Sequence, residues 1–449
     1  MLPEKFLLRM KNILGEEYAA FESALSEPSV RGVRVNTTKI SVDNFLGVSS
    51  LSLEKIPYLN DGFIPESADG IGRSAEHHSG MFYVQDPGAM ATVGAVDIKR
   101  GWRVLDTCAA PGGKASQLAS AVGDEGVLLA NEYVPKRAKI IVGNLERLGI
   151  KNAVVTSLDT AKLAEMFSSY FDLVLCDAPC SGEGMFRKYD EAVSEWSEEN
   201  VLACAKRQSE ILENCQSCVK AGGYLLYSTC TYSVEENEGV IEEFLSRHPD
   251  FSLVEVKDEL KATTADGLGK FKAARRFYPH KSRGEGQFIA LLKKDENSGN
   301  LPTILYKDSA KSPSKADEAV ARVFLKDNLK TEFSGRIISV GEQLAIVSHD
   351  LPIPPYSVFM SGVLLGEVKK GILFPHHQFF SAFGADMKRR VELKKGDARV
   401  EKYLVGEEID TDITEGGWCA VTYEGVALGG GKISGGRVKN HYPKGLRNK

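Results

Sequence analysis

The stretch RVLDTCAAPGGK, from Arg103 to Lys114, decides the fold of this chain. A short apolar strand, Arg103–Asp106, leads into a turn of small residues, and a helical pattern follows the turn. A turn of this kind lets a ligand approach the backbone closely, and the first N–H groups of the helix remain free to meet a polar group. The stretch predicts the first strand and the ligand-binding turn of a doubly wound α/β sheet.

Two common phosphate-binding motifs do not fit this turn. The glycine pattern of the dinucleotide fingerprint, G-x-G-x-x-G, is absent. A P-loop requires glycine where Cys108 stands and Ser or Thr where Ala115 stands. The turn is therefore not expected to bind phosphate.

Around this stretch, short apolar runs alternate with helical patterns, as in a mostly parallel sheet covered by helices on both faces. Seven strands are predicted, and the absence of a helix before the last one favours an antiparallel strand near the sheet edge. The predicted strands are Arg103–Asp106, Gly126–Ala130, Ala153–Thr156, Asp172–Cys176, Gly223–Tyr227, Phe251–Val256 and Gln287–Leu292.

The length of 449 residues exceeds one hydrophobic core, so several domains are expected. A small mixed unit with a strand at VRVNTTK (33–39) precedes the sheet, and a stretch rich in Lys, Ser, Asp and Pro (295–318) reads as a linker. Short β-like runs with glycine-rich turns follow it. The predicted domains are 1–85, 86–295, 296–375 (linker and first C-terminal domain) and 376–449.

The bulk composition is that of a soluble globular protein, 43% hydrophobic and 26% charged. No secretory leader or apolar run of about 18 residues is found, so we expect a cytoplasmic chain that does not enter a membrane. Eight cysteines in this length predict thiols rather than a disulfide scaffold. The pairs His77–His78 and His376–His377 have no third ligand at suitable spacing, so no metal is expected.

Carboxylates end two of the predicted strands. Glu132 follows the second strand about 20 residues after the turn, where a carboxylate can accept both hydroxyls of a ribose. Asp159 follows the third strand and could accept from an adenine amino group. Each alone reads as a solvated residue, but together they favour a nucleoside ligand.

Two cysteines follow the fourth and fifth strands, in DAPCSGEG (177–184) and STCTYSVEENE (228–238). A thiol in such a pocket can act as a nucleophile, although a free cysteine is most often a small buried hydrophobe. Cys180 and Cys230 are equal candidates from the residues alone.

These motifs, with DTCAAPGGK (106–114) and RFYPHKSRGEGQFIA (276–290), resemble those of the NOL1/NOP2/Sun family of RNA 5-methylcytosine methyltransferases, over about residues 30–295. The resemblance implies a class I Rossmann-like methyltransferase sheet that uses S-adenosyl-L-methionine. It also implies that Cys230 bonds to carbon 6 of cytosine and that Cys180 assists product release. In DNA cytosine methyltransferases the cysteine of the Pro-Cys motif is the nucleophile, so the opposite assignment has a precedent.

The chemistry explains why a thiol is needed. Carbon 5 of cytosine is a poor nucleophile until a thiolate adds to carbon 6, and an acid near ring nitrogen 3, for which Asp177 is the candidate, stabilises the developing charge. By the same resemblance, the cofactor contacts are expected from Cys108, Ala109, Ala110, Pro111, Gly112, Gly113, Lys114, Glu132, Arg137, Asp159 and Asp177.

The flanking units point to RNA. The tail GVALGGGKISGGRVKNHYPKGLR (425–447) resembles the PUA-like α+β extension of the small-subunit rRNA members, and residues 33–39 and 62–90 resemble the family's N-terminal α/β RNA-facing domain. We expect a monomer acting on 16S rRNA or the 30S subunit. The alternatives are the same chemistry on tRNA, or a catalytically idle RNA-binding assembly factor.

The net charge of −5 counts mildly against a nucleic-acid partner, so local basic clusters decide the matter. One cluster is KFKAARRFYPHKSR (270–283), and the other is the last 25 residues, with six Lys or Arg and no acid. The interleaved aromatic residues favour RNA contact through stacking. They are Phe271, Phe277, Tyr278 and Tyr442.

Overall fold

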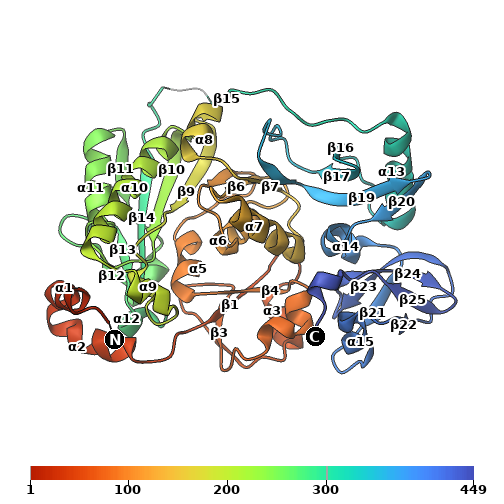
Figure 1. Cartoon of the computed structure of the whole chain (residues 1–449), viewed down its shortest axis with the longest axis horizontal. Coiled ribbons are helices and arrows are strands. Elements are labelled where there is room, and N and C mark those ends of the chain that lie inside the picture. The colour runs from red at the N-terminus through yellow and green to blue at the C-terminus, as the bar shows by residue number, and fades with distance from the viewer. Residues whose placement is uncertain (1, 300–301, 449) are drawn as a thin grey trace.

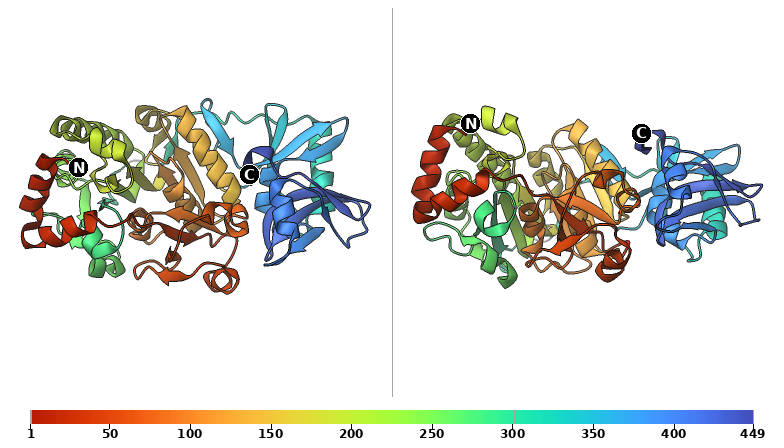
Figure 2. Two further views of the ribbon diagram at one scale, coloured as in Figure 1. Left: turned by 60° about the horizontal axis from the view of Figure 1, so that its bottom comes forward. Right: turned by 90° about the horizontal axis from the view of Figure 1, so that it is seen from below.

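The computed structural model describes residues 2–299 and 302–448. The chain forms an elongated row: the methyltransferase-like sheet with its N-terminal additions on one side, and two smaller sheets on the other (Figures 1 and 2). Both faces of the large sheet carry apolar clusters, so the core is a three-layer sandwich.

The N-terminal segment contributes to two different parts of the molecule. Its four-stranded sheet has the order β2-β3-β1-β4, whereas the first two helices bury Phe6, Met10 and Phe21 against Trp196 and Tyr232. The elements are α1 (Glu4–Leu14), α2 (Tyr18–Leu25), β1 (Gly32–Val35), α3 (Val42–Val48), β2 (Leu53–Lys55), β3 (Gly62–Pro65), α4 (Ala75–His78) and β4 (Phe82–Gln85).

The strand expected at residues 33–39 ends early, at Val35. The side chain of Asn36 causes this ending, because its amide donates to the carbonyls of Gly80 and Leu148 while its oxygen accepts from the backbone N–H of Thr38. A buried asparagine used in this way favours a turn over a strand.

The central sheet has the order β12-β13-β14-β10-β9-β5-β6-β7-β18, with β11 also paired to β14. All seven predicted strands are present, and β14 is antiparallel to β10 as expected. They are β5 (Arg103–Asp106), β6 (Val127–Asn131), β7 (Ala153–Thr156), β9 (Phe171–Asp177), β10 (Val219–Thr229), β11 (Phe251–Val254) and β14 (Gln287–Lys294). The additional strands are β12 (Ala265–Asp266), β13 (Arg275–Phe277) and β18 (Val358–Ser361).

Two details of this sheet differ from the sequence prediction. Strand β10 starts four residues early because Val219 pairs with Phe171 before a bulge, in which Gly222 has a φ of +72°. Strand β18 comes from the C-terminal half of the chain and pairs antiparallel with β7. Periodicity cannot reveal such a distant partner, because the pairing is a tertiary contact.

Helices cover both faces of the sheet, as Figure 1 shows. They are α5 (Pro87–Gly94), α6 (Gly113–Val122), α7 (Pro135–Leu148), α8 (Thr160–Met166), α9 (Asp190–Ser194), α10 (Glu198–Gln216), α11 (Glu238–Arg247) and α12 (Pro279–Ser282). The short strand β8 (Phe167–Ser168) pairs with β15 (Thr303–Ile304), so the predicted linker lies along the central domain.

The C-terminal half contains two sheets, ordered β16-β17-β19-β20 and β21-β23-β24-β25-β22. The strands are β16 (Arg336–Val340), β17 (Gln343–Val347), β19 (Val363–Lys369), β20 (Ile372–Pro375), β21 (Arg390–Leu393), β22 (Ile409–Asp410), β23 (Gly417–Tyr423), β24 (Val426–Ser434) and β25 (Arg437–Asn440). The helices are α13 (Lys315–Asn328), α14 (His377–Phe383) and α15 (Arg399–Val405). This agrees with the α+β units expected there.

The first basic cluster does not offer its aromatic rings to a ligand. Phe271, Phe277, Tyr278 and, in the tail, Tyr442 are all buried, so their expected stacking on RNA is wrong. Arg275 and Arg276 are buried too and pair with Asp266 and Glu238. These rings and cations belong to a segment that packs into the domain around β13. Composition alone cannot distinguish such a buried segment from an RNA-binding surface. The basic residues described in the tail, in contrast, are mostly exposed.

Candidate active site

The turn after β5 forms part of the wall of a cavity of about 500 Å³. Gly112 ends the turn with a φ of +112°, a conformation that favours glycine, and helix α6 starts at the next residue. The cavity is lined by Ser29, Arg31, Tyr83, Val84, Gln85, Asp86, Ala89, Asp106, Cys108, Ala109, Ala110, Pro111, Gly113, Lys114, Asp177, Met185, Arg187, Lys188, Tyr189, Cys230 and Gln287.

Most of the predicted site therefore gathers at one edge of the sheet. The ends of β5, β9 and β10 are adjacent there because these strands are parallel neighbours, so Asp106, Asp177 and Cys230 share one cavity. A cavity of about 560 Å³ elsewhere, between the central domain and the C-terminal half, contains none of the predicted site residues.

Asp106 is the least satisfied group in the wall. Its side chain is fully buried, and neither carboxylate oxygen has a hydrogen-bond partner among the described residues. Burial, reinforced by the nearby Asp177, raises the pKa of Asp106 to about 8. Two buried acceptors without donors fit a ligand that brings N–H or O–H groups. Asp106 belongs to the DTCAAPGGK motif, but the residues alone assign it no role.

Asp177 is held in an ion pair. Lys114 Nζ lies 2.8 Å from Asp177 Oδ2, and Gln287 Nε2 lies 3.5 Å from Asp177 Oδ1. Burial would lower the pKa of Lys114, but the attraction of Asp177 outweighs it and the pKa is raised. The pair therefore positions a lysine ammonium and a carboxylate in the cavity wall.

The two candidate cysteines face each other. Their Sγ atoms are 3.1 Å apart, and only Cys230 lines the cavity, whereas Cys180 lies behind it. The contact with Cys230, together with burial, raises the pKa of Cys180 well above that of a free thiol. The two thiols therefore have different surroundings in the structure, a difference that the sequence alone does not reveal.

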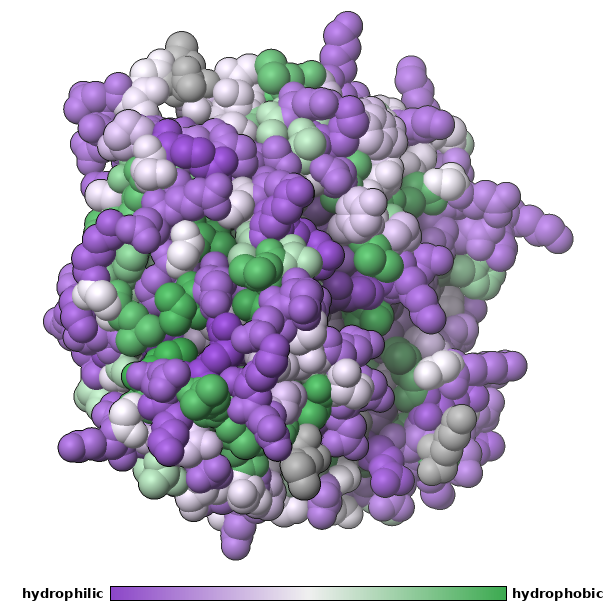
Figure 3. Space-filling model, turned by 60° about the vertical axis from the view of Figure 1, so that its left-hand side comes forward, coloured by the Kyte–Doolittle hydropathy of each residue, from purple (hydrophilic) through white to green (hydrophobic). Residues whose placement is uncertain are grey.

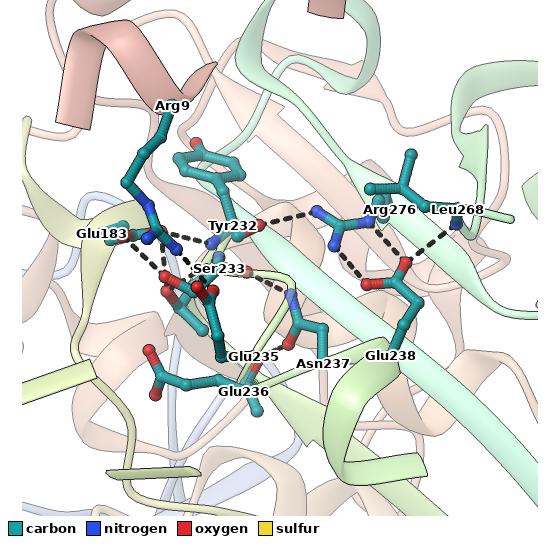
Figure 4. Close-up of polar contacts among 12 residues, drawn as sticks. Arg9, Glu183, Tyr232, Ser233, Glu235, Glu236, Asn237, Glu238, Leu268 and Arg276 are labelled. Atoms are coloured by element: carbon teal, nitrogen blue, oxygen red, sulfur yellow. Dashed lines mark hydrogen bonds and ion pairs between the residues drawn. The ribbon is translucent and has the colours of Figure 1, made fainter. Parts of the chain in front are cut away.

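A buried carboxylate network fixes the loops that carry these cysteines (Figure 4). Glu183 accepts hydrogen bonds from Trp196 Nε1, the Thr231 and Ser233 hydroxyls and the N–H of Tyr232. Glu183 is not adjacent to a cysteine in the sequence, but its hydrogen bonds hold the backbone that follows Cys230.

Glu236 holds the other loop. Its carboxylate accepts from the N–H and the hydroxyl of Ser181 and from Gln208 Nε2. Burial raises the pKa of Glu236. Both glutamates belong to the quoted motifs, but only the tertiary structure shows that each reaches across to the opposite cysteine loop.

Four predicted cofactor residues lie outside the cavity lining: Gly112, Glu132, Arg137 and Asp159. Glu132 accepts from the N–H of Val134, at 3.0 Å, and pairs with Arg137 at 3.4 Å. Asp159 caps helix α8 by accepting from the N–H of Ala161. Gly112 is also outside the lining, although its neighbours on both sides are part of it.

Neither a metal centre nor a membrane-spanning helix is found in the part of the chain that the structure describes. His377 is buried and His77 is half-buried, and both have lowered pKa values because burial disfavours their charged forms. His78 instead bonds to Tyr442 and Asn448, which ties the N-terminal sheet to the tail.

Comparison with known proteins gives matches over nearly the whole chain. Residues 94–293 match the family model described as 16S rRNA methyltransferase RsmB/F, residues 2–87 match the N-terminal domain of 16S rRNA methyltransferase RsmF, and residues 390–448 match the methyltransferase RsmF PUA domain. A ribosomal RNA small subunit methyltransferase F from Vibrio vulnificus is 32% identical over 472 aligned residues, covering 99% of this chain and 97% of the relative.

Solved structures share the fold. A methyltransferase homologue from Pyrococcus horikoshii is 29% identical with a TM-score of 0.55, covering 65% of this chain and all of that one. NSun6 from Pyrococcus horikoshii, solved with SFG, an analogue of S-adenosylmethionine, is 24% identical with a TM-score of 0.58, covering 65% of this chain and 98% of that one.

Proposed function

The chain belongs to the ribosomal RNA small subunit methyltransferase F family and is an S-adenosylmethionine-dependent methyltransferase, and on this basis we propose that it methylates carbon 5 of a cytosine in 16S rRNA. The relatives carry the rRNA substrate in their names, and the PUA domain match supports an RNA partner. Such a substrate favours a cytoplasmic location, and we propose that the enzyme acts as a monomer.

The residues of the cavity fit the cofactor. Asp106 offers two unpaired acceptors to an amino group or to hydroxyls, and the turn from Cys108 to Lys114 offers a close approach of the backbone. Glu132, the proposed partner of the ribose, pairs with the half-exposed Arg137. Bound S-adenosylmethionine supplies a methyl group on a positively charged sulfur.

Cys230 is the proposed nucleophile because its sulfur lies in the wall of this cavity. Its thiolate adds to carbon 6 of cytosine, which gives carbon 5 the electron density needed to accept a methyl group. Lys114 lines the same cavity as Cys230, and its ammonium is held there by Asp177.

Lys114 and Asp177 together supply the polar contacts for the pyrimidine ring. Asp177 was expected to act as an acid near ring nitrogen 3. Its ion pair with Lys114 holds this carboxylate in place. After the methyl group is attached, the proton on carbon 5 leaves to a base and the Cys230 thiolate departs from carbon 6. We assign Cys180 to this last stage, because it touches the Cys230 sulfur from behind.

The observation that carries the proposal is the position of Cys230 in the cavity that also holds the unpaired Asp106 and the small-residue turn. This cavity combines a nucleophilic thiol, space for a cofactor and carboxylate oxygens without a partner among the described residues.

The direct test is to incubate the enzyme with radiolabelled S-adenosylmethionine and either 30S subunits, naked 16S rRNA or tRNA, all from cells lacking the modification. We expect 5-methylcytidine in digests of 30S subunits or 16S rRNA. Label only in tRNA would contradict the rRNA assignment, and no label in any RNA would support an idle assembly factor instead.

A further inference from the structure

Among the described residues that line the catalytic cavity, one cation has no anionic partner. Lys114 pairs with Asp177, Arg187 with Glu285 and Lys188 with Asp86. Arg31 lines the same cavity, is exposed, and makes no side-chain hydrogen bond or ion pair with any residue between 2 and 299 or 302 and 448. An unpaired guanidinium at the mouth is available for an external anion.

Tyr189 is the exposed aromatic residue of this cavity. Its side chain is 57% exposed, and it is the one large exposed hydrophobic residue in the lining within the described part of the chain. Its hydroxyl makes no hydrogen bond with any residue that the structure describes.

The loop that carries Tyr189 is firmly anchored. Arg187 bonds to Glu285 at 2.8 Å and to the carbonyls of Ala24 and Gly284, while Lys188 pairs with Asp86. The N–H of Tyr189 donates to the carbonyl of Met185 at 3.0 Å. The ring is thus presented on a fixed backbone, which lowers the entropic cost of binding to it.

The face of the molecule drawn in Figure 3 is largely hydrophilic, with hydrophobic residues in several separate groups. No broad apolar interface is visible there. Polar and charged contacts with single aromatic platforms are what a single-stranded nucleic acid uses.

We propose that Arg31 and Tyr189 bind the RNA nucleotide next to the target cytosine, Arg31 through its phosphate and Tyr189 by stacking on its base. This inference rests on the proposed RNA substrate. A cytosine that enters the cavity must leave its stack, so its neighbour loses a stacking partner, and an aromatic ring at the mouth replaces it.

The charges around the mouth of the cavity favour an RNA strand that passes between Arg31 and Tyr189. Arg31 and Ser29 also line a neighbouring hollow, but that hollow contains Glu66 and Asp69, which have no cationic partner among the described residues. Unpaired carboxylates repel a phosphate backbone. The strand is therefore expected to pass between Arg31 and Tyr189 and not into that hollow.

Two variants of Tyr189 and one control variant test the stacking contact in the full-length enzyme, with 30S subunits lacking the modification as substrate. Tyr189→Ala should lower kcat/KM about tenfold, whereas Tyr189→Phe should stay within about twofold because the ring remains. Tyr356→Ala, which removes a comparably exposed tyrosine outside the cavity lining, should have no effect.

The salt dependence of KM tests the Arg31 contact, because the loss of a residue with only a structural role would not change it. Arg31→Gln should reduce the slope of log KM against log salt concentration by about 0.7, the value for one lost phosphate contact on single-stranded RNA, and Arg31→Lys should restore it. The affinity for S-adenosylmethionine should be unchanged in all these variants.

The two possible failures are distinguishable. If the wild-type enzyme methylates no RNA, the proposed function fails. If it methylates RNA and Tyr189→Ala and Arg31→Gln match the wild type in kcat/KM and salt slope, this inference is overturned.

Discussion

The hydroxyl groups of Ser181 and Thr231 lie 2.9 Å apart, and each residue directly follows one of the two facing cysteines. This contact joins two loops that are 50 residues apart in the chain. Glu236 bonds to Ser181 and Glu183 bonds to Thr231, so the distance between the cysteine sulfurs depends on two buried carboxylates.

Replacing Glu236 should therefore impair catalysis more than folding. Glu236→Gln cannot accept from both donors of Ser181, which leaves a buried group unsatisfied at a cost of about 1–3 kcal/mol. We expect a fall in kcat of tenfold or more, with little change in the affinity for S-adenosylmethionine. Glu235→Gln is the matched control, because the partly exposed side chain of Glu235 pairs with Arg9 and with no other described residue. Equal kcat values in the two variants would contradict a positioning role.

The two cysteines should give opposite adduct phenotypes. With rRNA and S-adenosylmethionine, Cys180→Ala should accumulate a protein–RNA adduct that survives denaturation, because release is impaired. Cys230→Ala should form none, and Cys419→Ala, a buried thiol in the C-terminal half, should behave as wild type. Gel electrophoresis after denaturation measures this. An adduct with Cys230→Ala but not with Cys180→Ala would reverse the assignment.

Asp106 should make the ligand-free protein less stable as the pH rises. Its pKa in the folded protein is about 8, above the value of about 3.8 expected on unfolding, so the folded state binds more protons between these values. The stabilisation is complete below pH 4 and is lost as the pH rises to 8.

Asp106→Asn should consequently raise Tm at pH 8, by an amount equivalent to a few kcal/mol at most, and the gain should shrink at pH 5. The same variant should lose the increase in Tm that S-adenosylmethionine gives the wild type. Thermal unfolding at the two pH values, with and without the cofactor, measures both effects. A destabilised Asp106→Asn at pH 8 would argue against a buried, unpaired carboxylate.

Glu132 offers a test of the cofactor position that the resemblance implies. If its carboxylate holds the ribose, Glu132→Gln should weaken S-adenosylmethionine binding tenfold or more, since hydrogen bonds to a charged group contribute about 1.5–3 kcal/mol. Calorimetric titration measures this, with Glu165→Gln, an exposed carboxylate on α8, as control. Unchanged affinity would leave Glu132 with its contacts to Arg137 and the N–H of Val134.

Arg276 should matter for stability and not for RNA affinity. It is buried and pairs with Glu238, and removing one partner of a buried pair costs about 3–5 kcal/mol. Arg276→Leu should lower the free energy of unfolding by several kcal/mol, whereas Lys272→Leu, at an exposed position of the same segment, should not. Chemical denaturation and an RNA-binding assay separate the two roles.

The sequence by itself determined the central sheet and the identity of the site loops. Strand alternation, small-residue turns and the position of each motif after a strand are local features, so seven strands and the loops carrying Asp106, Cys180 and Cys230 could be predicted from the chain alone. The parallel arrangement of β5, β9 and β10 then brings their carboxyl ends to one edge.

Only the tertiary structure decided how these loops meet. Burial of Arg276 and the aromatic rings around it, the Glu183 and Glu236 bridges, the unpaired Asp106 and the added strand β18 all depend on contacts between residues far apart in the chain. The physical reason is that desolvation and hydrogen-bond pairing depend on what surrounds a side chain in space. A basic aromatic segment has the same sequence whether it faces RNA or fills a core.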